Sequence, residues 1–168
     1  MNTELIIISI LLVCLVFLPF ILVPFVQNRG SKNLKNKFRD EAVRLGLNID
    51  LKENWSCNFI GIDTNQKKLL FVQKIEENFI SEFVDLATVK QSRVVVTEIH
   101  KKNGKKEESE LQKLDLEFSF FGGQGTKLIN LYDRDINFAQ DLELKHAEKW
   151  NTQIAGFLNS QPLLKKSA

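Results

Sequence analysis

Residues 111–121, LQKLDLEFSFF, decide the fold class of this chain. From 114 to 120 apolar and polar residues alternate strictly, with Leu114, Leu116, Phe118 and Phe120 separated by Asp115, Glu117 and Ser119. Successive side chains of a β-strand point to opposite faces, so this period predicts a strand with one buried and one hydrated face. Such half-buried strands are typical of antiparallel sheets.

Further strand patterns lie on both sides of this stretch. WSCNFIGID (55–63) and LLFVQKI (69–75) flank the polar turn TNQKK and predict a hairpin, in which Ile60 and Ile62 face one side and Phe59 the other. RVVVTEI (93–99) and KLINLYD (127–133) are β-branched or apolar, and NFISEFVDLATV (78–89) holds a shorter strand. Together these patterns predict six or seven antiparallel strands.

The C-terminal part predicts one amphipathic helix. Asn137 is the expected N-cap, with Gln140 completing a capping-box-like pair. The expected inner face of the helix consists of Phe138, Leu142, Trp150, Ile154 and Phe157. The predicted fold class is therefore α+β and mainly β, an antiparallel barrel or sandwich over 48–160 closed by this helix, with a flexible tail at 161–168.

Residues 5–26, LIIISILLVCLVFLPFILVPFV, contain no charged residue and predict a transmembrane helix. A cleaved signal peptide is disfavoured, because the preceding MNTE carries no base and no A-x-A site follows. The role of Pro19 and Pro24 stays open.

Five bases follow this run before the next acid: Arg29, Lys32, Lys35, Lys37 and Arg39. Because bases resist translocation, they predict a single-pass protein of the inner membrane, with its N-terminus outside and its C-terminal domain in the cytoplasm. The same bases could instead contact anionic lipid headgroups. Within 27–47 the basic linker leads into an amphipathic helix, which either docks on the domain or lies along the membrane.

Composition narrows the function classes. From Asp40 onward 20 acids face 18 bases, which argues against a nucleic-acid-binding protein. The two cysteines, Cys14 and Cys57, indicate no disulfide scaffold, and the two histidines lack cysteine partners at zinc spacing. No cofactor is expected.

The order of several meandering strands and one helix with an inward Trp150 resembles a pleckstrin-homology-like domain over about 55–158. The resemblance rests on NFIGID–TNQKK–LLFVQ, RVVVTEI, LDLEFSFF and FAQDLELKHAEKWNTQIAGFL. It extends to bacterial membrane proteins that carry such a domain. The resemblance implies a scaffold that binds peptides, proteins or lipid headgroups and is not usually catalytic. Headgroup-binding members have a first hairpin rich in lysine and arginine, whereas only Lys67 and Lys68 stand here.

Three functions follow from these observations. The first is a non-catalytic binding or scaffolding module that recognises a protein partner at the membrane. The second is a sensor of anionic lipid surfaces that uses the basic linker with Lys67 and Lys68. The third is an enzyme that uses Asp133 and Asp135, or Cys57, although a turn and a buried thiol are the simpler interpretations of these residues.

Overall fold

The computed structural model describes residues 12–14, 16–17, 31–103, 106–123, 125–137 and 142–159; of 101–103 and 106–108 it describes the backbone alone. A helix at 31–44 comes before the strands. The elements that follow are β1 (Leu51–Trp55), β2 (Asn58–Asp63), β3 (Lys68–Ile75), β4 (Asn78–Asp85), β5 (Val89–Asn103), β6 (Lys106–Phe120), the short turn η1 (Phe121–Gly123), β7 (Thr126–Asp133) and α2 (Glu143–Asn159).

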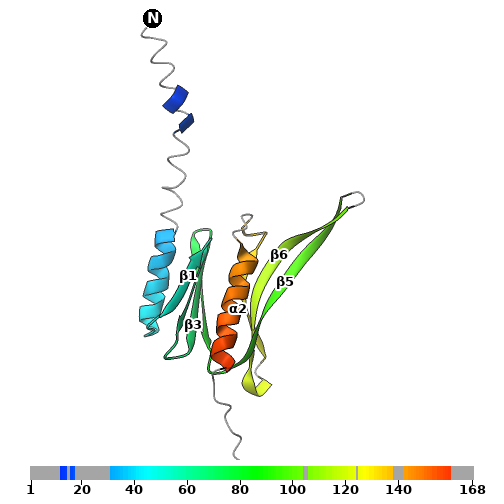
Figure 1. Cartoon of the computed structure of the whole chain (residues 1–168). Coiled ribbons are helices and arrows are strands. Elements are labelled where there is room, and N and C mark those ends of the chain that lie inside the picture. The colour runs from blue at the N-terminus through cyan, green and yellow to red at the C-terminus, as the bar shows by residue number, and fades with distance from the viewer. Residues whose placement is uncertain are drawn as a thin grey trace, which may run out of the picture.

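The strands form two antiparallel sheets, one ordered β1-β2-β3-β4 and the other β5-β6-β7. The predicted strand at 114–120 lies in the centre of the second sheet, with Leu114, Leu116 and Phe118 fully buried. The hairpin of β5 and β6 extends beyond the third strand, which pairs with β6 only between Lys113 and Ser119 (Figure 1).

The two central strands of the first sheet, β2 and β3, are buried on both faces. Ile60 and Ile62 point into the central core between the sheets, whereas Phe59 packs with the apolar side of the 31–44 helix. Leu34, Phe38 and Ala42 of that helix are buried against this outer face. The amphipathic helix predicted within 27–47 therefore docks on the domain, which was one of the two positions expected for it.

Close approach of the 31–44 helix depends on Gly61 in β2. A Cβ atom at this position would lie 2.6 Å from Ile49 Cγ2 and 2.8 Å from Phe38 Cζ. Glycine lacks that atom, so the helix and the segment leading into β1 can pack directly on the strand.

The prediction was a pleckstrin-homology-like barrel or sandwich; the sheets do not close, so the barrel is wrong. Helix α2 lies between the two sheets (Figure 1) and bridges them, because Trp150 contacts Glu53 of β1 and Asn151 accepts a hydrogen bond from Ser92 of β5. Buried Ala147, Trp150 and Ile154 complete the core. Helix α2 thus occupies the space between the two sheets, where a closed barrel would have paired their strands. The mainly β body and its C-terminal helix are confirmed.

The closing helix differs from its prediction. It begins at Glu143, so Asn137 is not its N-cap, and Phe138 and Gln140 lie outside the described residues. Leu142 comes before the helix and is 66% exposed instead of buried. Glu143 takes a buried position, because its carboxylate accepts a hydrogen bond from Trp55.

The transmembrane prediction is corrected as well. Of 5–26 the structure describes only residues 12–14 and 16–17, whereas a membrane-spanning helix needs about 20 residues. Over the part of the chain that is described, no helix is both long and apolar enough to cross a membrane. The single-pass topology and inner-membrane location derived from that helix are therefore not supported and are withdrawn.

Candidate functional site

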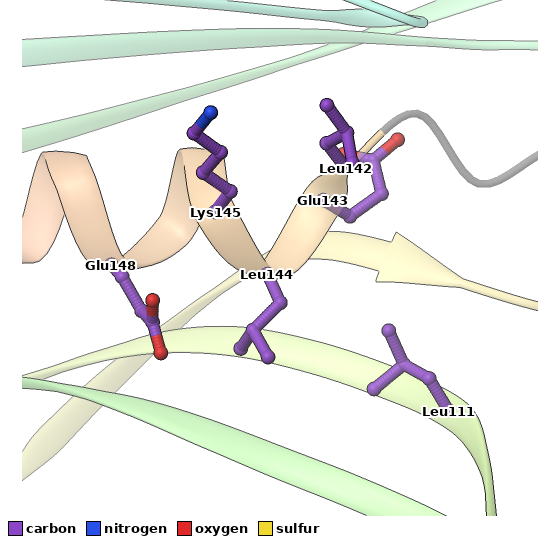
Figure 2. A pocket seen from close by; sticks show the side chains of 6 residues that line it. All are labelled: Leu111, Leu142, Glu143, Leu144, Lys145 and Glu148. Carbon is purple, nitrogen blue, oxygen red and sulfur yellow. The ribbon is translucent and has the colours of Figure 1, made fainter.

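A groove of about 510 Å3 runs between the N-terminal end of α2 and strand β6 (Figure 2). We call it the leucine groove; it is lined by Leu111, Leu142, Glu143, Leu144, Lys145 and Glu148. Leu144 points from α2 toward the strand that carries Leu111, while Lys145 lies on the other side of the helix (Figure 2). The groove thus has apolar walls and charges of both signs at its rim.

Two of the three leucines of this groove are exposed although they are large and apolar, whereas Leu111 is partly buried. Leu142 is 66% and Leu144 is 42% exposed. Leu142 also has a φ of 55°, a left-handed conformation that side chains with a Cβ atom rarely adopt. Strained, solvent-facing apolar residues cluster at binding sites more often than elsewhere, so this end of α2 is a candidate docking surface.

A network of polar contacts fixes α2 behind the leucine groove. The indole nitrogen of Trp55 donates to the buried carboxylate of Glu143. The ring of His146 stacks on Trp55, with centroids 5.0 Å apart and planes 12° apart. His146 is therefore partly buried against β1.

Glu53 of β1 anchors the next turn of α2. Its carboxylate accepts hydrogen bonds from Trp150 Nε1 at 2.5 Å and from Lys149 Nζ at 2.8 Å, and it lies 3.2 Å from His146 Nδ1. Burial alone would raise the pKa of Glu53, but the hydrogen bonds from Lys149 and Trp150 outweigh it and lower the pKa. A charged Glu53 therefore anchors α2, which forms one wall of the leucine groove, against the first sheet.

Of the three side chains considered for catalysis, Asp133 and Cys57 are engaged in structural contacts, whereas Asp135 is exposed. Asp133 forms an ion pair of 2.9 Å with Lys113, which lowers the pKa of the carboxyl group, and it caps the backbone N–H of Asp135. Burial raises the pKa of the Cys57 thiol, which is the opposite of the activation that a nucleophile requires. Asn137 Nδ2 lies 3.7 Å from the sulfur. Within the described residues, no three metal-ligating side chains come together.

A second candidate site lies between the 31–44 helix and the outer face of the first sheet. This helix–sheet pocket has a volume of about 260 Å3. Apolar side chains form most of its wall: Phe38, Ala42, Val43, Leu47, Ile49 and Phe59. The remaining lining residues are Asn36 and three bases, Lys35, Arg39 and Lys52.

The helix sorts its bases onto two faces. Glu41 forms ion pairs with Lys37 and Arg44, at 2.9 and 2.7 Å. Hydrogen bonds from these two bases lower the pKa of Glu41. Lys35 and Arg39 lie on the pocket side instead, where like charges four residues apart disfavour the helix by about 0.2–0.5 kcal/mol.

The seven predicted headgroup contacts do not form one site. Lys35 and Arg39 line the helix–sheet pocket, Lys32 is exposed, Lys37 is paired with Glu41, and Arg29 is outside the described residues. Lys67 and Lys68 lie at the β2–β3 turn, which Gln66 joins to Gly46 beyond the C-terminal end of the helix. They line neither the groove nor this pocket.

Sequence reasoning missed the residues that complete both sites. Lys52 comes from β1, and no spacing along the chain relates it to Lys35 and Arg39. Leu144 is not among the residues of the expected inner face of the closing helix. That absence was the sequence signal for its exposure.

Comparison with protein-family models, curated proteins and solved structures finds no match to this chain. The resemblance to pleckstrin-homology-like domains therefore stays a prediction, and the geometry of the sites carries the functional argument.

Proposed function

We propose that this chain is a non-catalytic binding module that docks an apolar segment of a protein partner in the leucine groove. The observation that carries this proposal is the exposure of Leu142 and Leu144 around a groove of about 510 Å3. Exposed apolar side chains that line a groove with a polar rim are typical of interaction sites.

The rim of the groove favours a protein over a lipid or a nucleic acid. Lys145 and Glu148 bring opposite charges to its edge. A phosphate-rich surface would be attracted by one and repelled by the other, whereas a protein segment can present both signs. The anchored helix behind the rim supplies the preformed wall that helix-in-groove recognition uses.

The contribution of the leucines can be bounded. Full burial of a leucine side chain contributes about 1.5–3 kcal/mol. A partner that covers Leu142 and Leu144 buries only the fraction of each side chain that is now exposed, so each leucine contributes less than this full value. Replacing both with aspartate should therefore weaken binding by at least tenfold, with the added cost of placing charges in the interface.

A site-specific crosslink tests the proposal. A photoreactive residue replaces Glu148, which lies on the same side of α2 as Leu144 (Figure 2), in the full chain expressed in its own cells, and the covalent partner is identified and purified. We expect one partner, whose affinity for the purified chain falls at least tenfold in Leu142→Asp/Leu144→Asp. The matched control carries the photoreactive residue at Phe121, which is 55% exposed beyond the opposite end of β6.

Two outcomes contradict the proposal. Equal crosslinking yields at Glu148 and Phe121 would mean that the groove captures proteins nonspecifically. An identified partner whose affinity does not change in the double variant, with the circular dichroism spectrum of the folded chain retained, would place the contact elsewhere.

A further inference from the structure

The helix–sheet pocket combines two features that the leucine groove lacks. Its wall is apolar, and every charged group that lines it is positive. It also lies on the outer face of the first sheet, whereas α2 packs on the inner face. A ligand of this pocket is therefore independent of the partner proposed above.

The bases at the rim are available to an anion. Among the described residues, neither Lys35 nor Lys52 has a carboxylate within ion-pair distance. Arg39 has only a loose contact of 3.9 Å with the exposed Asp40. Glu41, the one buried acid of the helix, is directed to Lys37 and Arg44 and does not line the pocket.

The size of the pocket limits what enters it. Its 260 Å3 lie below the roughly 300–1,000 Å3 of sites for drug-sized ligands. At about 30 Å3 for a group the size of a water molecule, the space takes roughly nine such groups. One aliphatic tail fits this space, whereas a peptide segment of several residues does not.

We propose that the helix–sheet pocket binds a free fatty carboxylate with a tail of roughly eight to ten carbons. The tail lies against the stacked rings of Phe38 and Phe59, whose centroids are 4.1 Å apart. The carboxylate is held at the rim by Lys35, Arg39 and Lys52. Charge-assisted hydrogen bonds to lysine and arginine are among the strongest that a carboxylate forms, and bound anion relieves the repulsion among these bases.

Calorimetric titration of the full chain with sodium decanoate tests the proposal. We expect one decanoate per chain, with 1-decanol binding at least tenfold more weakly because it lacks the charge. The variant Arg39→Gln/Lys52→Gln should lose at least tenfold in affinity for decanoate and little for decanol. Lys90→Gln, which removes an exposed base of β5, is the matched control and should bind as the parent chain does.

Aromatic NMR signals give a second readout that does not depend on the variants. Decanoate should shift the ring resonances of Phe38 and Phe59 and leave those of Phe121 in place. Absence of a shift at these rings, equal affinities for decanoate and decanol, or an unchanged affinity in the double variant would each overturn the proposal. So would binding to phosphatidylglycerol vesicles without binding to decanoate, since the bases would then serve a lipid surface.

Discussion

Adding one methyl group at Gly61 should destabilise the protein, although alanine is the better residue in most strands. The new Cβ would meet Ile49 Cγ2 at 2.6 Å, Phe38 Cζ at 2.8 Å and the backbone oxygen of Leu51 at 3.1 Å. Phe38 cannot yield freely, because its ring is stacked on Phe59. The strand or the docked helix must therefore shift.

Two opposing terms set the size of this effect. Overpacking a well-filled core costs about 1–3 kcal/mol. Removing the conformational freedom of a glycine from the unfolded chain returns about 0.5–1 kcal/mol. We expect Gly61→Ala to lower the free energy of unfolding by about 1–2 kcal/mol, since the steric term is the larger. The helix–sheet pocket shares Phe38 and Ile49, so its affinity for decanoate should fall as well.

Urea denaturation of the full chain measures the change, and Gly156→Ala is the control. Gly156 lies in α2 with no atom within 4 Å of its added Cβ, so alanine should stabilise this helix by about 0.5–1 kcal/mol. The same substitution thus has opposite signs at the two positions. In the double variant Gly61→Ala/Ile49→Ala the closest of the three contacts is removed while that to Phe38 remains, and we expect a favourable coupling of about 1 kcal/mol.

Stabilisation by Gly61→Ala, or a double variant whose destabilisation equals the sum of the two single changes, would refute this reasoning. Either result would mean that the 31–44 helix is not held against β2 at the distance the structure gives.

Three further changes test other contacts. Trp55→Phe removes the indole donor to the buried Glu143 and should cost about 1–3 kcal/mol in the free energy of unfolding, measured in urea. Asn58→Leu should cost a similar amount, because Gln73 and a backbone carbonyl of β7 lose their partner, whereas the added change Gln73→Leu should recover part of it. Asp63 has a lowered pKa because a backbone N–H donates to its carboxylate, against the opposing effect of burial, so it stabilises the fold above about pH 4 and this is lost as pH falls through the folded-state pKa. Thermal unfolding between pH 7 and 2 should show a weaker acid dependence in Asp63→Asn, and an unchanged dependence would exclude this role.

Local pattern alone determined the secondary structure of much of this chain. Alternation at 114–120 and the apolar positions Leu34, Phe38 and Ala42 identify the correct buried faces, because the periods of strands and helices are properties of the backbone itself. For the same reason the sequence placed Ile60 and Ile62 on one face of β2 and Phe59 on the other. Most strand positions followed from side-chain type, and the C-terminal helix from its spacing, whereas strand β1 (Leu51–Trp55), LKENW, was not predicted.

Tertiary structure decided whether the sheets close, where α2 begins and which bases stand together. Leu142 has the spacing of a core residue, yet it is exposed because buried Glu143 bonds to Trp55 from a strand 88 residues away. Lys52 joins Lys35 and Arg39 only because Gly61 lets the helix settle on the sheet. Contacts between residues distant in the chain depend on packing in three dimensions, and no periodicity along one segment records them.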